Sequence, residues 1–286
     1  MNEINLAYLQ NWVGRETTTH DLLAPRHAGL MAATLGLPRD ALGVGAPLPP
    51  LWHWTYFLEG LPPTELGRDG HPARGGFLPP VPLPNRMWAG GTVSFDAPLP
   101  LGAAVEKRSR IASVQHKTGR SGDLVFVTVA HEIWHEGQLA LRELHDIVYK
   151  SATPAHPAPP VGAVVPTDTG LPVSTRTRTY RPDATQLFRY SALTFNGHRI
   201  HYDLDYCRGV EGYDNLVIHG PLNATLLAAW AQEVAGRPLR EFRYRGLRPA
   251  LLGQTLTLHW GESAGTAMVW VTLESGAVSM QAEAMF

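Results

Sequence analysis

The chain has 286 residues, of which 44% are hydrophobic and 17% charged, and its formal net charge at pH 7 is −1. These values indicate a globular protein with a substantial core in one or two domains. No basic run is long enough for a nucleic-acid surface, and no apolar run approaches the ~18–20 residues of a membrane-spanning helix. Cys207 is the only cysteine, which excludes an intrachain disulfide. We therefore expect a cytoplasmic protein that binds neither nucleic acid nor membrane.

Helical patterns open the chain. Apolar residues recur at helical spacing within 4–13, and we expect a second helix over 22–37 with capping residues at 17–21 before it. Residues 43–85 are rich in proline, glycine and aromatic side chains, which predicts a covering segment with a short helix near 53–60. Its aromatic side chains either pack structurally or line an acyl pocket.

Alternating apolar residues then predict strands over 92–95, 104–116, 124–134 and 139–148, with a hairpin turn at 117–123. A stretch rich in proline and alanine follows and is typical of a linker. The predicted organisation is a first domain over 1–150, a linker over 151–175 and a second domain over 176–286.

The second domain repeats the order of the first. The patterns predict an edge strand at 175–180, a helix at 184–194, a long apolar helix at about 220–235 that opens with Gly220 and Pro221, and four strands at 239–247, 254–260, 267–273 and 277–284. Each half thus places helical material before about four antiparallel strands. We interpret the halves as a diverged internal repeat, in which a sheet is wrapped around a buried helix.

Between the two helices of the second half lies Thr194-Phe-Asn-Gly-His-Arg-Ile-His-Tyr-Asp203. This stretch resembles the motif of the MaoC-like hydratase/dehydratase family, which has the hotdog fold and reads roughly Ser-Gly-Asp-x-Asn-Pro-(Ile/Leu)-His-x-Asp. The resemblance implies that His201 is the catalytic histidine. Asn196 stands where the family has its catalytic Asp, which is a departure from the pattern.

The helix start Val217-Ile-His-Gly-Pro-Leu222 is similar to the family's His-Gly-x-Leu, whose Gly amide supports the thioester oxygen. That role would fall on Gly220. The longer stretch Tyr190–Asp203 more closely resembles a double-hotdog branch, which includes mesaconyl-C4-CoA and itaconyl-CoA hydratases and mitochondrial-type 3-hydroxyacyl-thioester dehydratases. The fold implied is α+β, a double hotdog with two antiparallel sheets each wrapped around a long helix. The first half matches only as a degenerate hotdog, so we expect one active site per chain.

Addition of water to an α,β-unsaturated thioester needs a group for the proton of water, a proton for Cα and a donor for the enolate oxygen. A histidine suits the first task because its pKa is near neutral, so we expect His201 to handle this proton. Pro221 has no N–H, so Gly220 or Leu222 must donate to the oxygen. Asn196 can orient the water or the carbonyl but cannot act as a base.

Other residues near the motif are open to two interpretations. A partner carboxylate for the reaction is Asp203 or Glu211. His198 is expected to be structural rather than catalytic. The residues predicted to contact substrate are Tyr190, Arg199, Arg208, His219 and Leu222, although Tyr190 and His219 also suit a buried structural role and the arginines a solvated rim. His131 and His135 share a strand face, but no third ligand is apparent, so we expect no metal and no cofactor.

The sequence therefore predicts a hydratase/dehydratase of an enoyl-CoA, with a short dicarboxylyl-CoA such as itaconyl-CoA or mesaconyl-CoA as the substrate. Two alternatives are a 3-hydroxyacyl-thioester dehydratase of fatty acid synthesis, which acts on longer chains, and a non-catalytic acyl-thioester binding module. Assembly as a homodimer is an option, because sheets of this kind often associate edge to edge.

Overall fold

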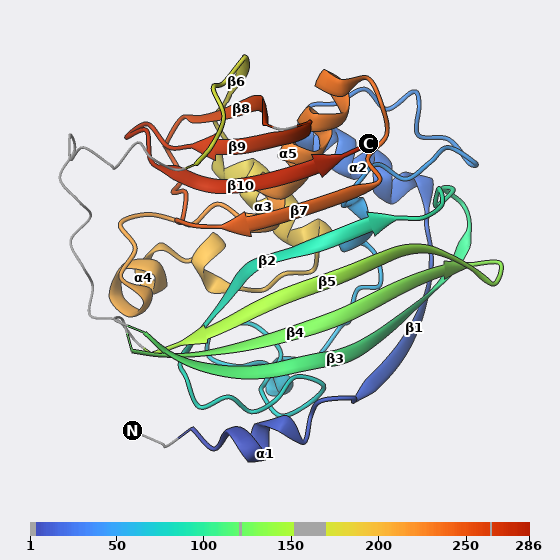
Figure 1. Cartoon of the computed structure of the whole chain (residues 1–286). Helices are drawn as coiled ribbons and strands as arrows, with labels where there is room; N and C mark the ends of the chain where they lie inside the picture. Colours follow the sequence, from blue (N-terminus) through green and yellow to red (C-terminus); the bar gives the residue numbers. More distant parts are fainter. Residues whose placement is uncertain (1–3, 120–121, 152–169, 264) are drawn as a thin grey trace.

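The computed structural model of the chain describes residues 4–119, 122–151, 170–263 and 265–286 (Figure 1). Ten strands in these residues form an antiparallel sheet in the order β1-β3-β4-β5-β2-β7-β10-β9-β8-β6. The five strands of the first half of the chain therefore lie on one side and the five of the second half on the other. β2 and β7 pair across this boundary, so the two half-sheets form one continuous surface.

The strands are β1 (Glu16–Leu22), β2 (Asn85–Phe95), β3 (Ala104–Gly119), β4 (Gly122–His135), β5 (Gln138–Lys150), β6 (Arg176–Tyr180), β7 (Glu241–Gly246), β8 (Leu256–Ser263), β9 (Thr266–Thr272) and β10 (Val278–Met285). The helices are α1 (Leu6–Gln10), α2 (Pro25–Leu35), α3 (Ala184–Leu193), α4 (Leu204–Tyr206) and α5 (Gly220–Ala235). The 3₁₀ turns are η1 (Trp52–Thr55), η2 (Pro63–Glu65) and η3 (Arg199–His201), and η4 (Cys207–Glu211) is a π turn.

The helix α5 is the centre of the second half. It packs against β7, β8, β9 and β10, and the half-sheet lies over it in Figure 1. Small and apolar side chains cover most of its circumference, which favours burial on all sides. Its residues without solvent exposure are Leu222, Ala224, Leu227, Ala228 and Ala231. The helix ends at Gly236, whose φ of 62° gives the left-handed cap that glycine adopts readily.

The helix α2 is the longest described helix of the first half. It has 11 residues and contacts α3 and η1. Ala28, Met31 and Ala32 are fully buried, and they belong to the same core cluster as the buried residues of α5. The two halves therefore share a continuous hydrophobic core.

The structure corrects the expected start of the second helix. Residues 17–21, which were predicted to cap it, form most of β1, which pairs with β3 along its length. The threonines of this segment favour a strand, and the pairing satisfies backbone groups that a cap would leave without partners. α2 therefore begins at Pro25, and its N-cap Ala24 makes no side-chain hydrogen bond.

The predicted helices at 184–194 and about 220–235 are confirmed as α3 and α5, and the short helix near 53–60 is found as η1. Asp183 caps α3, since its Oδ1 accepts the N–H of Gln186 at 2.8 Å. Residues 152–169 of the predicted linker and 120–121 of the predicted hairpin turn lie outside the described residues. The described helices include none with the length and apolar character needed to cross a membrane.

Candidate active site

A cavity of about 530 Å³ lies where the two halves meet. The first half supplies residues of β2, β4, β5 and the loop before β2, and the second half supplies the turn at 194–203, the start of α5 and the segment after β7. Its apolar wall includes Phe77, Leu78, Met87, Val129, Ile147 and Met280. This volume is in the usual range for a small-molecule site, and both halves are needed to enclose it.

His201 lines the cavity at the end of η3. Its Nδ1 lies 2.7 Å from the carbonyl oxygen of Val217, and a carbonyl can only accept, so Nδ1 carries the hydrogen. Nε2 is then the unprotonated nitrogen in the neutral ring. Burial lowers the pKa of His201 to about 4, and the nearby His71 acts in the same direction. The side chain is therefore a neutral imidazole at pH 7, which is the form that accepts a proton.

Asn196 also lines the cavity. Its backbone N–H donates to Ser191 O at 2.8 Å, and its Oδ1 accepts the N–H of His198 at 3.0 Å. These bonds fix the side chain and engage its oxygen. The amide NH₂ group remains available to donate to a water or a carbonyl.

The amino end of α5 opens onto the same cavity, which is lined by Gly220, Pro221 and Asn223. The N–H of Asn223 donates to His219 O, whereas within the described residues the N–H of Gly220 has no backbone acceptor. A free N–H at a helix start favours negative charge. His201 and Gly220, which the sequence paired, thus face one cavity.

Gly220 is required by packing rather than by its backbone angles. A Cβ at this position would lie 2.7 Å from Cε3 of Trp88 on β2. The Trp88 ring is stacked on Tyr244 with centroids 4.6 Å apart, and Trp54 meets it edge-on. The indole therefore has little room to move, and the first half holds the helix start in place.

The remaining predicted residues lie outside the cavity. Tyr190 and Leu222 are buried in the core at 1% and 0% exposure. The ring of His219 is stacked on that of His201 with centroids 3.6 Å apart, and its Nε2 is hydrogen-bonded to Ser191 Oγ. Tyr190 and His219 thus occupy the buried positions that the sequence left as an alternative. They support the site from behind rather than line it.

The predicted arginines are also turned away. Arg199 pairs with Asp203 through two hydrogen bonds of 3.0 and 2.7 Å, and Arg208 donates to the carbonyl of Asp214. Neither belongs to the cavity lining. Asp203 is committed to Arg199 and to the cap of α4, so it is not the free partner carboxylate considered above. Glu211 does line the cavity.

Two other arginines, Arg86 on β2 and Arg248 after β7, line the cavity instead. Within the described residues Arg86 makes no ion pair. Sequence reasoning missed both because neither is near the motif in the chain. Arg248 is held by its hydrogen bond to Val278 O, and Arg86 lies on β2, which pairs with β7. Both contacts depend on the tertiary fold.

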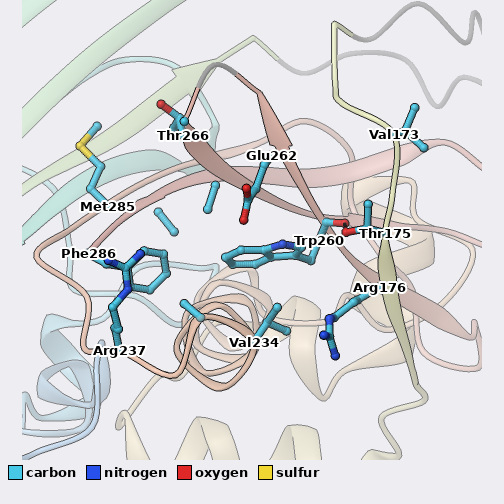
Figure 2. A pocket seen from close by; sticks show the side chains of 14 residues that line it. Val173, Thr175, Arg176, Val234, Arg237, Trp260, Glu262, Thr266, Met285 and Phe286 are labelled. Carbon is cyan, nitrogen blue, oxygen red and sulfur yellow. Dashed lines mark hydrogen bonds between the residues drawn. The ribbon is translucent and has the colours of Figure 1, made fainter.

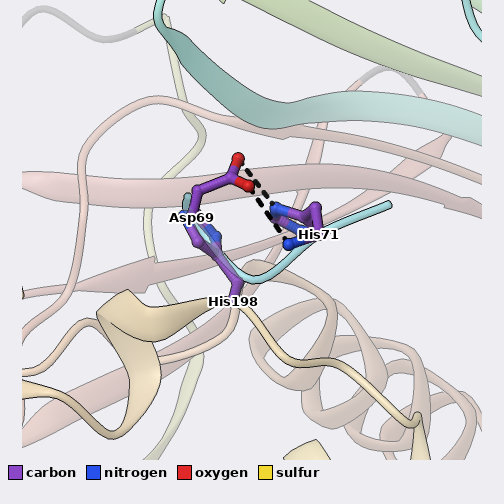
Figure 3. A group of neighbouring side chains, drawn as sticks. All are labelled: Asp69, His71 and His198. Carbon is purple, nitrogen blue, oxygen red and sulfur yellow. Dashed lines mark hydrogen bonds and ion pairs between the residues drawn. The ribbon is translucent and has the colours of Figure 1, made fainter. Parts of the chain in front are cut away.

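Histidines of the first half also reach the site. His71, His131 and His145 line the cavity, and Figure 3 shows His71 beside Asp69 and His198. Burial lowers the pKa of His131 to about 3, despite the opposing charge of Glu143. His135, its expected neighbour on the strand, bonds to Ala104 O and takes no part.

A larger hollow of about 1220 Å³ lies at the other end of α5 (Figure 2). Arg176, Arg237, Trp260, Glu262 and Phe286 are among the residues around it. It contains none of the residues of the turn at 194–203 or of the start of α5. The convergence of acid–base and donor groups therefore favours the smaller cavity as the active site.

A neutral imidazole, a side-chain amide and an open helix start thus lie together at one cavity between the two halves of the chain. The family described as hydroxyacyl-thioester dehydratase type 2 matches residues 51–252. The chain belongs to this family and is an enzyme of the hydratase/dehydratase class.

Two relatives illustrate the range of the family. The chain is 44% identical over 238 residues to a mesaconyl-C(4)-CoA hydratase of Chloroflexus aurantiacus, and the match covers 83% of each protein. It is 25% identical over 282 residues to a mitochondrial hydroxyacyl-thioester dehydratase type 2 of Schizosaccharomyces pombe, with 88% of this chain and 91% of that protein covered.

Solved structures confirm the fold. A MaoC-like dehydratase from Phytophthora capsici superposes with a TM-score of 0.72 at 13% identity, covering 99% of this chain and 98% of that one. A Mycobacterium tuberculosis protein described as a double hotdog gives a TM-score of 0.62 at 12% identity, covering 95% of both chains. The predicted α+β double-hotdog fold is therefore confirmed.

Proposed function

We propose that this enzyme hydrates the double bond of a short α,β-unsaturated dicarboxylyl-CoA of the mesaconyl or itaconyl type. The observation that carries the proposal is the position of Arg86, a guanidinium without an ion pair among the described residues, in the same cavity as His201 and Gly220. A guanidinium in such a cavity suits a carboxylate, because it offers paired donors and a permanent charge. The 44% identical mesaconyl-C(4)-CoA hydratase supports the same substrate class.

The residues at the cavity suit the steps of hydration. The substrate's thioester oxygen would accept the N–H of Gly220, so that charge developing in the enolate meets the helix start. His201 Nε2 would receive a hydrogen bond from the attacking water, and the amide of Asn196 would orient that water or the carbonyl. The proton of water would pass to an imidazole of the cavity and return to Cα, so that both additions occur on one face.

The test is a comparison of substrates in two variants, Arg86→Gln and Arg248→Gln. We expect Arg86→Gln to lower kcat/KM for mesaconyl-C4-CoA and itaconyl-CoA about 10-fold to 100-fold more than for crotonyl-CoA, because a hydrogen bond to a charged group contributes about 1.5–3 kcal/mol. Arg142→Gln, which breaks an exposed pair with Asp96, is the matched control. Equal losses on all three substrates would remove the dicarboxylyl assignment.

A second candidate is dehydration of a longer 3-hydroxyacyl thioester. The apolar wall formed by Phe77, Leu78, Val129 and Ile147 favours it, as does the Schizosaccharomyces pombe relative. Turnover of decenoyl-CoA above that of the dicarboxylyl-CoA substrates would support this second function. Tight binding without turnover of any substrate would instead select an acyl-thioester binding module.

The proposal also includes the domain organisation, the assembly and the location. We assign residues 1–150 to a degenerate hotdog and 176–286 to the catalytic one. β1 and β6 each pair with one described strand, and such edges support a homodimer, which sedimentation analysis would test. The single cysteine is compatible with a reducing cytoplasm, where fractionation of the source cells should find the protein.

A further inference from the structure

One polar segment at the cavity has no role in the function proposed above. It is the loop of residues 66–72, which carries Asp69 and His71. Oδ1 of Asp69 accepts the backbone N–H of His71 at 3.1 Å, and Oδ2 lies 3.3 Å from His71 Nδ1 (Figure 3). An ionised carboxylate only accepts, so Nδ1 carries the hydrogen. The other ring nitrogen, Nε2, is then unprotonated and makes no hydrogen bond to a described residue.

This loop is held directly against the turn at 194–203. The N–H of Arg199 donates to Asp69 O at 2.9 Å. Gly70 has φ of +86°, and a Cβ there would lie 1.9 Å from Gly197 O; a Cβ on Gly197 would lie 2.7 Å from Gly70 O. Both glycines are therefore needed for this backbone contact. The loop is positioned by the catalytic turn rather than by the sheet alone.

The contact brings imidazoles from the two halves together. The ring of His198 is a neighbour of both His71 and His201, with centroid distances of 4.2 and 5.5 Å. Burial lowers the pKa of His198 to about 2 and also lowers that of His71. In His71 the hydrogen bond to Asp69 opposes this effect. The three rings are thus neutral at rest, and of the three only His71 is hydrogen-bonded to a carboxylate in the described part of the chain.

The geometry bears on the residue missing from the motif. A water that attacks Cβ with a lone pair needs acceptors for both of its O–H groups, and one of them must take a proton. His201 Nε2 is one acceptor. Asn196 stands in the place of the family's carboxylate, but its oxygen is already engaged by His198 N–H, and an amide cannot take a proton.

We propose that His71 is a second catalytic acid–base residue of this site and takes the proton of the attacking water, with Asp69 as its positioning residue. The proposal rests on the hydratase function proposed above. The family's motif has a carboxylate where the second half of this chain has Asn196. In the proposal, Asp69 of the first half supplies a carboxylate to the site instead. The proposal also moves to His71 the proton transfer that the sequence assigned to His201.

The water oxygen forms a bond to Cβ, one O–H bond breaks, and its proton goes to Nε2 of His71. The other O–H of the water stays hydrogen-bonded to Nε2 of His201 and becomes the product hydroxyl. The electrons of the double bond move to the thioester oxygen at the N–H of Gly220. The imidazolium of His71 then returns its proton to Cα, so that one water is added and the neutral ring is restored.

A metal ion is the competing interpretation, because ligand atoms of Asp69, His71 and His198 lie within 4.8 Å of one another. The local charge argues against it. Arg86 lies close enough that its positive charge lowers the pKa of each of these three residues. A divalent cation would add to that charge with a single carboxylate to balance it.

The test uses purified full-length His71→Gln and Asp69→Asn, with mesaconyl-C4-CoA and crotonyl-CoA as probes. The partly exposed pair of His116 and Asp123, 2.8 Å apart, provides matched controls in His116→Gln and Asp123→Asn. We expect His71→Gln to lower kcat about 10²-fold to 10⁴-fold on the better substrate with little change in KM, and the controls to stay within about 2-fold of the wild type.

Asp69→Asn separates positioning from structural damage. The charges and rings that face His71 are those of Asp69, Arg74, Arg86 and His198, and among them only the carboxylate favours the imidazolium. Its removal should lower the pKa of His71, so the acid limb of the kcat/KM profile should move to lower pH while kcat falls. An unmoved limb would overturn the role of Asp69.

Other outcomes are equally decisive. If His71→Gln keeps kcat within about 3-fold of the wild type while His201→Gln is inactive, the second base is removed and the hydratase function stands. If the wild type turns over none of the substrates, the proposed function itself fails. Loss of activity on chelation and recovery with zinc or iron would replace the acid–base pair by a metal. If His71→Gln does not fold by circular dichroism, the pH profile of Asp69→Asn decides alone.

Discussion

The two halves of the chain each supply five strands of the sheet but contribute differently to the cavity. α2 and α5 both begin with a proline in the first turn and end at a left-handed glycine, Gly36 and Gly236. The start of α5 opens onto the cavity, whereas no residue of α2 lines it. The second half supplies the turn at 194–203 and the helix start, and the first half supplies a wall, arginine and histidine side chains, and the Trp88 contact.

One buried carboxylate of the first half contrasts with two groups that the second half presents to the cavity. In the first half, Glu143 accepts from His53 at 3.0 Å and from Trp54 at 2.9 Å, so its carboxylate is closed off by partners. In the second half, Nε2 of His201 and the N–H of Gly220 face the cavity without a described hydrogen-bond partner. Satisfied groups stabilise a fold, and unsatisfied ones are available for chemistry.

The largest effect should come from His201→Gln, which tests whether the second half carries the essential imidazole. Loss of the ring removes an acceptor for water and the stacking partner of His219, so we expect kcat/KM to fall about 10³-fold or more. Stopped-flow or initial-rate hydration assays would measure kcat/KM. A variant with a normal thermal melt and more than a tenth of the wild-type rate would show that the second half does not carry the essential imidazole.

Gly220→Ala tests the contact through which the first half positions the second. The new Cβ would meet Trp88, so we expect unfolding free energy to fall by about 1–3 kcal/mol and hydration to fall about 10²-fold as the donor shifts. Urea unfolding and kcat would be measured together. Gly209→Ala is the matched control, because nothing lies within 4 Å of its Cβ. Equal effects in both variants would contradict the packing argument.

The smallest effect concerns pH. The pKa of His201 is lowered by burial to about 4, below the unfolded value of about 6.5. Below about pH 6.5 the unfolded chain binds the proton more readily, so stability should fall as pH drops from 6.5 towards 4. His201 should cost roughly 1 kcal/mol of stability at pH 5.5. The free energy of unfolding, measured with denaturant, should differ less between pH 7.5 and 5.5 in His201→Gln than in the wild type. An unchanged difference would contradict the neutral buried ring.

Local patterns predicted much of this molecule. The alternation of residues predicted the strands, and the apolar run closed by glycine and proline predicted α5. The motif led to His201, Asn196 and Gly220, which all line one cavity. The error at residues 17–21 has a local cause, since threonine serves both as a helix cap and as a strand residue.

The sequence by itself determined the double-hotdog order, the turn at 194–203 and the glycine at the helix start, because each depends on residues close together in the chain. Only the tertiary structure decided which cationic and imidazole side chains share the cavity. Arg86 and His71 lie more than 100 residues before the turn at 194–203 in the chain, and the pairing of β2 with β7 and the contact of Gly70 with Gly197 bring them there. Such contacts leave no periodic signal, since they join segments whose local patterns are independent.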